Sequence, residues 1–458
     1  MKILIKFRKS IMFLIKSMII AALSFCFVQV WVTHYTDALY YQKGNYLVVF
    51  SFAFLLIVFS SLFGAFYIGI YRTHEIIYSF SLAVLFTNFF MYLELSLIAR
   101  YLINPIHLGL NTIIQLIIVF IGSYCANTIY FKLYAARRLL AIFGDDQTGF
   151  KLIKKMSEIP DRFRIEQGVN INSKSVDEIK QMIDKFEGVL ICDIDKNVEK
   201  EILSYCYAKN KRTYLLPSIT DIIINNSNEI QISDTPVLMC HNKGLSTEQK
   251  ILKRAMDIII SASLLIITLP ITLITALCVK LYDGGPIFYT QNRVTQNGKI
   301  FNILKFRSMI VDADKDGAFK TEANDKRITK VGKIIRPLRI DELPQLINVL
   351  LGDMSMVGPR PERVQNVYEY SLQYPEFDLR HRVKAGVTGF AQIYGKYNTS
   401  PKDKLNMDLF YIETYSPLLD IKLLILTLKI LFLRESTEGF ESSSNDNIRK
   451  SKSIRPKK

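Results

Sequence analysis

Four long apolar runs dominate the first third of the sequence, at about residues 11–33, 45–70, 78–100 and 111–133. Each run reaches the roughly 20 residues that an α-helix needs to cross the hydrocarbon core of a bilayer. A helix satisfies its backbone polar groups internally, as any segment within lipid must. The runs therefore predict a membrane protein whose N-terminal region, residues 1–136, is a four-helix transmembrane bundle.

Positive charge flanks this region on both sides, which bears on its orientation. The flanking cations are Lys2, Lys6, Arg8 and Lys9 before the first run, and Lys132, Arg137 and Arg138 after the fourth. Segments rich in lysine and arginine remain on the cytoplasmic side of a membrane. Because an even number of spans returns the chain to its starting side, both ends of the region are expected in the cytoplasm.

The composition of the chain limits the kinds of partner that it is expected to bind. The formal net charge is +16 over 458 residues, and 50% of the residues are hydrophobic. Such a charge suits anionic lipids or phosphorylated substrates. No nucleic-acid recognition motif of the usual kinds is present, so no nucleic-acid partner is predicted. The six cysteines are scattered without a Cys-x-x-Cys pair, which argues against a zinc site and a disulfide framework.

Residues 137–250 have a different pattern, in which short apolar segments alternate with amphipathic ones. Three of the apolar segments are interpreted as buried strands: 139–143, 188–193 and 212–216. This alternation predicts a small parallel sheet with helices, in a Rossmann-like domain. Gly144–Gly149 follows the first strand, where a dinucleotide-binding loop would lie. Asp145 and Asp146 in that loop would repel a pyrophosphate, so the domain is expected to lack a clear cofactor site.

A fifth apolar run, Ile258–Val279, is long enough to span a membrane but contains Pro270 near its middle. Proline removes a backbone donor and bends or breaks a helix. Cations lie at both ends of the run, including Lys253 and Lys280, so neither end favours the far side of the membrane. We therefore expect residues 257–279 to form a re-entrant helix that enters and leaves on the cytoplasmic face.

Two adjacent acids lie in an apolar frame in the C-terminal part of the chain. Asp341 and Glu342 are preceded by Arg336 and Arg339 and followed by Arg360. A carboxylate among cations is expected to keep a low pKa and to be available as a nucleophile or a metal ligand. Arginines can hold phosphate oxygens in a bidentate manner. The pattern predicts phosphoryl chemistry by a carboxylate.

The motifs around these acids resemble the signature of the bacterial sugar transferases, which are the monotopic polyprenyl-phosphate phosphoglycosyl transferases. The motifs that carry the resemblance are Lys253-Arg254 with Asp257, Gly285–Phe288 with Gln291 and Arg293, Lys305–Met309, Asp325–Thr329, Asp341–Gln345, Asn348–Leu350, Gly352–Met354 and Val357–Pro361. The resemblance covers roughly residues 251–440. The sequence departs from the family pattern at Thr295, where glycine is expected, and at Arg339-Ile340, where Ser-Leu is more frequent.

The resemblance implies a covalent mechanism. Asp341 would be the nucleophile, and Glu342 would help to bind Mg²⁺. Arg336 and Arg360 would bind the phosphates or the nucleotide of the substrate.

Two further cations are expected to bind substrate. Lys305 and Arg307 alternate along a predicted strand, residues 301–306, so they are expected to share a face and to line the anionic substrate. Contact with lipid head groups is the alternative for this pair. His381, in a charged segment, is expected to be solvated and not to act as a general base.

These interpretations predict an α+β catalytic domain over residues 251–440, followed by a disordered basic tail at 441–458. The expected reaction is transfer of a sugar 1-phosphate from a nucleotide-sugar, in particular a UDP-sugar, to polyprenyl (undecaprenyl) phosphate. The products would be the polyprenyl-diphosphate-linked sugar and UMP, which would initiate exopolysaccharide, capsule or O-antigen synthesis. The resemblance implies the bacterial inner membrane, with the soluble domains in the cytoplasm and in contact with membrane lipids.

Two other functions are compatible with the sequence. One is a non-catalytic membrane scaffold or sensor whose middle domain binds a nucleotide. The other is an ordinary glycosyltransferase, which would release a nucleoside diphosphate. The sugar, the polysaccharide pathway, the role of the middle domain and the oligomeric state, including a homodimer, are left open by the sequence.

Overall fold

The computed structural model describes residues 7–35, 44–134, 136–144, 147–240, 244–311, 325, 327–395 and 399–431. The chain divides into two compact units, residues 1–217 and 218–458. Asp145 and Asp146 of the expected loop, and the expected tail at 441–458, lie outside the described residues.

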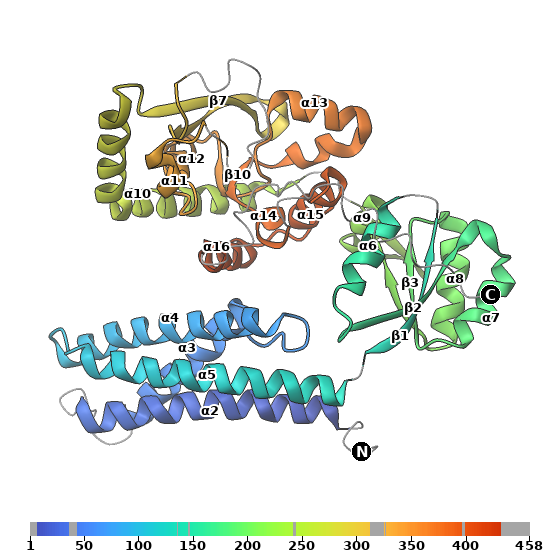
Figure 1. Cartoon of the computed structure of the whole chain (residues 1–458), viewed down its shortest axis with the longest axis horizontal. Helices are drawn as coiled ribbons and strands as arrows, with labels where there is room; N and C mark the ends of the chain where they lie inside the picture. Colours follow the sequence, from blue (N-terminus) through green and yellow to red (C-terminus); the bar gives the residue numbers. More distant parts are fainter. Residues whose placement is uncertain are drawn as a thin grey trace. The chain divides into compact units, whose positions relative to one another are not determined.

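The N-terminal unit begins with four long helices that pack against one another (Figure 1). They are α2 (Arg8–His34), α3 (Gly44–Leu62), α4 (Thr73–Ala99) and α5 (Ile106–Leu133). Large aromatic side chains such as Phe27, Phe52 and Phe80 are buried between the helices, whereas apolar residues such as Phe13 and Leu97 are exposed on the outside. An apolar exterior around an apolar core is what lipid-facing helices require.

The four predicted apolar helices are confirmed, with one correction of length. The second predicted run continued to residue 70, but α3 ends at Leu62. Gly64 and Gly69 follow it with left-handed backbones, at φ 77° and 81°, and turn the chain before α4 begins. Together with α10 (Thr247–Asp283), five helices of the described residues are long and apolar enough to cross a membrane. The protein is therefore a membrane protein.

The second part of this unit is a parallel sheet with the strand order β2-β1-β3-β4. Its elements are β1 (Arg137–Phe143), α6 (Gln147–Ser157), β2 (Phe163–Asn170), α7 (Val176–Asp184), β3 (Gly188–Cys192), α8 (Lys196–Ala208) and β4 (Arg212–Leu215). The three predicted strands are confirmed as β1, β3 and β4, all in parallel register. The prediction missed β2, which pairs with β1 at the edge of the sheet.

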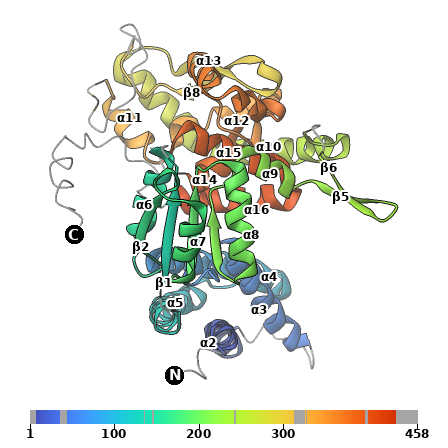
Figure 2. The same cartoon turned by 90° about the vertical axis from the view of Figure 1, so that its right-hand side faces the viewer.

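The C-terminal unit is a mixed α/β domain. Its elements are α9 (Ile219–Asn225), β5 (Asn228–Ile232), β6 (Thr235–Met239), α10 (Thr247–Asp283), β7 (Phe288–Val294), β8 (Ile300–Phe306), α11 (Lys330–Ile335), η4 (Ile340–Glu342), α12 (Gln345–Leu351), β9 (Ser355–Val357), α13 (Val364–Gln373), η5 (Pro375–Arg382), β10 (Gly386–Thr388), α14 (Phe390–Tyr394), α15 (Pro401–Glu413) and α16 (Pro417–Leu431). Figure 2 shows the β5–β6 hairpin extending from the rest of its unit. The other two sheets have two strands each, antiparallel for β7–β8 and parallel for β9–β10.

The longest helix, α10, contains the predicted proline. It runs for 37 residues with Pro270 inside it, and Figure 1 shows it as two arms that meet at a sharp bend. The hydroxyl of Thr272 donates to the carbonyl of Leu269 beside the proline, at 2.8 Å. The bend agrees with the effect of a proline within a helix.

The first arm of α10 is anchored to the rest of the unit by buried polar side chains. Lys253 forms an ion pair with Asp420 of α16, at 2.6 Å. Asp257 accepts hydrogen bonds from the hydroxyl of Ser355 and from the backbone N–H of Met356, at 3.0 and 2.9 Å. Arg254 donates to two carbonyls at the end of α12, those of residues 349 and 350. The contacts of Arg254 hold the end of α12, the helix that follows the acid pair.

Candidate active site

The acid pair lies on a single turn of 3₁₀ helix, η4, between α11 and α12. Pro337 follows the last residues of α11 and cannot continue that helix. The chain turns at Arg339, whose backbone is left-handed at φ 51°. A non-glycine residue in this conformation carries strain of the kind that is found at functional sites. The turn presents Asp341 and Glu342 together.

Glu342 is the centre of a cluster of cations. Its side chain is only 12% exposed, and its Oε1 lies 2.8 Å from Nζ of Lys305. Arg360 approaches the same oxygen at 3.2 Å, and Arg339 approaches Oε2 at 3.5 Å. Three cations from three different parts of the sequence are therefore gathered by one carboxylate.

The two acids have opposite pKa shifts. Burial alone would raise the pKa of Glu342, but the charges of Lys305, Arg360 and Arg339 hold that pKa well below its ordinary value. Burial, together with the charge of Glu342, raises the pKa of Asp341 to about 6. The predicted low pKa is thus wrong for Asp341, because its desolvation outweighs the neighbouring cations.

Asp341 is the less constrained of the two carboxylates. Among the described residues, no hydrogen bond or ion pair to its side chain is present. The charge of Arg336 acts on it and favours its ionised form. An acid that is not held by protein donors, next to cations that are held in place, can approach a phosphorus atom.

Arg307 does not join this cluster, although it was expected to share a face with Lys305. It lies one residue beyond the end of β8 and is buried, 7% exposed, in an ion pair with Asp283 at the end of α10. The ion pair of Arg307 therefore connects the end of α10 to the end of β8, which is a structural role. Lys305 and Arg307 therefore do not face the same partners, because Arg307 lies beyond the last residue of β8 and is paired with Asp283.

Gly285 lies directly against the guanidinium of Arg307, which a β-carbon at that position would meet. We expect Gly285→Ala to displace Arg307 and to cost about 1–3 kcal/mol of stability through overpacking. Thermal unfolding in detergent would measure the loss. Gly109→Ala is a suitable control, because nothing lies within 4 Å of a β-carbon there. An unchanged melting temperature for Gly285→Ala would contradict the close contact.

The fit of the site to Mg²⁺ rests on Asp341. Mg²⁺ commonly takes one or two carboxylates together with substrate phosphates. Within the described part of the chain, no three His, Cys, Asp or Glu side chains form a ready metal site. Both oxygens of Glu342 face cations, which makes it a poor ligand in this arrangement. Asp341 is the side chain that could offer an oxygen to the ion.

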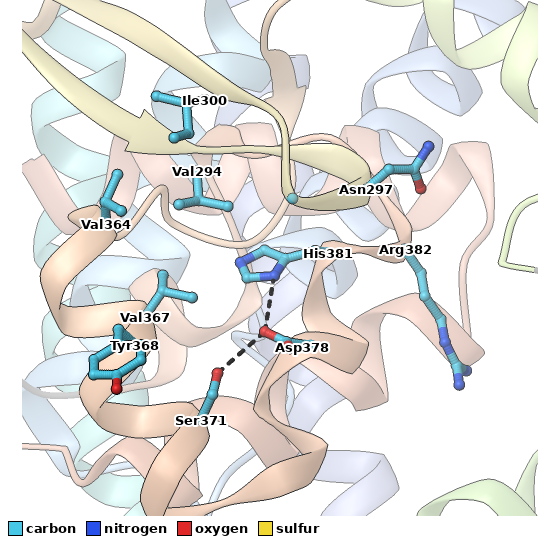
Figure 3. Close-up of a pocket in the computed structure, with 11 residues that line it drawn as sticks. Val294, Asn297, Ile300, Val364, Val367, Tyr368, Ser371, Asp378, His381 and Arg382 are labelled. Carbon is cyan, nitrogen blue, oxygen red and sulfur yellow. Dashed lines mark hydrogen bonds and ion pairs between the residues drawn. The ribbon is translucent and has the colours of Figure 1, made fainter.

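His381 lies away from the acid pair, in a cavity of about 600 Å³ (Figure 3). The ring points into the cavity, and its Nδ1 lies 3.6 Å from Asp378, which also accepts a hydrogen bond from Ser371. Burial and the charge of Arg380 lower the pKa of His381 to about 4. The side chain of His381 is 11% exposed and its ring borders the cavity, so it is less exposed than the predicted solvated position.

The cavity is at the turn of the β7–β8 hairpin, where Val294 pairs with Ile300. Lys305 is five residues further along β8, about 17 Å at roughly 3.4 Å per residue. His381 is therefore not placed to exchange a proton at Asp341.

Sequence reasoning did not select every residue of the site. Arg339 was noted as a flanking cation and as a departure from the family pattern, but no role was assigned to it. Its spacing of three residues from Glu342 was the available signal.

Known proteins resemble the part of the chain that contains the acid pair. Residues 248–434 match the model of the family described as bacterial sugar transferase. A UDP-glucose:undecaprenyl-phosphate glucose-1-phosphate transferase of Klebsiella pneumoniae is 38% identical over 226 residues, which are 48% of this chain and 49% of that protein. An undecaprenyl-phosphate glucose phosphotransferase of Komagataeibacter xylinus is 32% identical over 329 residues, 68% of this chain and 62% of that protein.

A shorter relative is matched almost completely. The uncharacterized sugar transferase EpsL of Bacillus subtilis is 41% identical over 189 residues, which are 41% of this chain and 91% of that protein. The chain spans about half the length of the first curated relatives that it matches. The nearly complete match to the shorter protein, together with the family model and the motifs around Asp341, shows that this chain belongs to the bacterial sugar transferase family.

Proposed function

We propose that this protein transfers a sugar 1-phosphate from a UDP-sugar to a polyprenyl phosphate and releases UMP. The observation that carries the proposal is Asp341, which has no hydrogen-bond or ion-pair partner among the residues that the structure describes, beside the cations that Glu342 gathers. Relatives that are named for sugar-phosphate transfer to undecaprenyl phosphate support the same reaction. The product would be the first lipid-linked sugar of a surface polysaccharide.

The first step would be attack by an oxygen of Asp341 on the phosphorus that bears the sugar. The bond between this phosphorus and the bridging oxygen breaks, and UMP leaves with the electron pair. Lys305 and Arg360, held by Glu342, would stabilise the charge on the transferred phosphoryl group. Arg336 would face the same phosphates, since its charge already acts on Asp341.

The second step would be attack by an oxygen of the polyprenyl phosphate on the phosphorus of the Asp341 adduct. The acyl phosphate bond breaks, Asp341 recovers its carboxylate, and the new bond completes the diphosphate. The attacking oxygen is already anionic, so no general base is required. Mg²⁺, if bound at Asp341, would supply neutralisation of the diphosphate charge.

The experiment that tests this function is a panel of UDP-sugars with membranes that contain the full-length protein and with polyprenyl phosphate. Release of UMP that depends on both the sugar nucleotide and the lipid is the expected result. Release of UDP instead would identify an ordinary glycosyltransferase. Absence of any nucleotide release across the panel would favour a non-catalytic scaffold and overturn the proposal.

We further propose the bacterial cytoplasmic membrane as the location, with the soluble parts in the cytoplasm and α10 re-entrant. The cations at both ends of the four-helix region support this orientation. Single cysteines near Lys253 and Lys280 are expected to react with a reagent from the cytoplasmic side. Labelling of the position near Lys280 from the outside would show that α10 crosses the membrane.

Pro270→Ala tests the role of the bend. A straightened helix over the 22 residues of the apolar run would be about 33 Å long, which is enough to cross the bilayer core. We expect the variant to misinsert in part and to lose activity in proportion, measured by the same labelling and by UMP release. Normal labelling with full activity would show that the surrounding protein, and not the proline, fixes the bend.

A further inference from the structure

Arg360 is carried by a short irregular segment, residues 359–362, between β9 and α13. We call it the Arg360 segment. Pro359 and Pro361 lie on either side of the arginine, so two of its four residues lack a backbone donor. Its conformation must therefore be fixed largely by hydrogen bonds that its carbonyl groups accept from other parts of the chain.

All four carbonyls of the Arg360 segment accept a hydrogen bond. The carbonyl of Pro359 accepts from the backbone N–H of Gly386 at 2.9 Å, and that of Glu362 accepts from the N–H of Val294 at 3.1 Å. The two carbonyls between them accept from the side chains of two arginines, one of them buried and the other half-buried. Arg380 donates to the carbonyl of Arg360, and Arg293 donates to the carbonyl of Pro361, each at 3.0 Å.

Arg380 is held rigidly for this contact. Its side chain is 2% exposed and forms an ion pair with Asp408 of α15, at 2.7 Å, whose side chain is 1% exposed. Its guanidinium also lies over the ring of Phe377, 4.9 Å from the centroid. Two of its nitrogens, Nε and Nη1, are buried without a hydrogen-bond partner among the described residues.

The buried ion pair of Arg380 and Asp408 is not explained by a contribution to stability alone. Burying two charges carries a desolvation cost that their attraction often does not exceed, and apolar replacements of similar volume are frequently neutral or stabilising. Arg293 is similar: it bonds Gln291 and the carbonyl of Pro361, while its Nε is buried without a partner in the described part of the chain. What both arginines share is a bond to the Arg360 segment.

We propose that Arg293 and Arg380 are positioning residues, which hold the Arg360 segment so that the guanidinium of Arg360 stays on Glu342 and on the phosphates of the donor. This inference rests on the proposed function of the site. Neither residue touches the acid pair in the structure; both act through the backbone of Arg360 or its neighbour. Placement of a substrate-binding group within a fraction of an ångström matters, since a displacement of about 1 Å can cost about 100-fold in rate.

The test uses the full-length protein with Arg380→Met and Asp408→Leu combined, which removes the pair and leaves no unpaired buried charge. The matched control is Arg382→Met with Glu413→Leu, a second pair between the same two elements, at 3.5 Å, that does not reach the Arg360 segment. Hydrogen exchange of a peptide that covers residues 355–365 is compared with the melting temperature and with kcat and KM.

We expect the Arg380/Asp408 variant to melt within a few degrees of the wild type, to exchange faster in this peptide and to lose about 100-fold in kcat/KM. The control should change neither exchange there nor kcat/KM. Added to Arg360→Ala, the Arg380/Asp408 change should cause no further loss, because residues that act through one another are not additive. Arg293→Lys should raise KM for the UDP-sugar, while its melting temperature should stay within a few degrees of that of the wild type.

Unchanged exchange at residues 355–365 would overturn the positioning role, whether or not the protein is active. A loss that multiplies with that of Arg360→Ala would do the same, because it would show a route independent of Arg360. If the wild type released no UMP with any sugar, the proposed function would fail, and the exchange measurement alone would still decide whether Arg380 holds the Arg360 segment.

Discussion

Asp341→Asn is expected to abolish turnover and to abolish the phosphosugar adduct on the enzyme. An amide has nearly the shape of a carboxylate but is a far weaker nucleophile, so the substitution removes the chemistry with little change in volume. The loss should be at least about 1,000-fold, since removal of a nucleophile can cost far more than that. UMP release and mass spectrometry of the protein after incubation with UDP-sugar alone are the two measurements.

The matched control for this variant is Asp353→Asn. Asp353 is an acid of the same unit whose half-buried side chain is paired with Lys299 at 3.3 Å, and among the described residues it makes no contact with the acid pair. It should keep the activity and the adduct of the wild type. Retention of more than a few per cent of activity by Asp341→Asn, or an adduct on another residue, would remove Asp341 from its role.

The pattern of apolar residues was sufficient to predict the long helices and the buried strands. Runs of about 20 apolar residues have few ways to fold other than as membrane helices, and β1 and β3 are buried on both faces. β2 was missed because only Val169 in it is buried, while its other residues are exposed or half-exposed. An edge strand of this kind has no apolar pattern from which it could be identified.

The identity of the acids could be predicted from the motifs, but their environment could not. The raised pKa of Asp341 depends on burial that only the folded chain creates. Arg293 and Arg380 are far apart in the sequence, and their convergence on the Arg360 segment follows from tertiary packing. The strand end at Phe306 was predicted, but the ion pair that turns Arg307 towards Asp283 and away from Lys305 depends on tertiary packing.

Glu342→Gln is expected to lower the activity by at least about 100-fold and to shift the pH dependence of the remaining activity to lower pH. Lys305, Arg339 and Arg360 would lose the charge that gathers them, and loss of one preorganised electrostatic contact commonly costs 100- to 1,000-fold. Raising the Mg²⁺ concentration should not restore the rate if Glu342 acts by holding cations. Restoration of the rate by Mg²⁺ would instead identify Glu342 as a metal ligand.

The pH dependence gives this variant its sharpest test. Asp341 must be ionised to attack, and its pKa is about 6, so the wild-type rate should fall as the pH decreases through about 6. The charge of Glu342 contributes to that raised pKa, and the same charge offsets the nearby cations. Removal of this charge lowers the pKa of Asp341 for two reasons: it removes a repulsion between the two carboxylates, and it leaves the nearby cations without the charge that offsets them.

The acid limb of the rate profile of Glu342→Gln should therefore lie at lower pH than that of the wild type, although the plateau of the rate is lower. An acid limb that remains near pH 6 would show that the titrating group is not Asp341 or that the two carboxylates are not coupled.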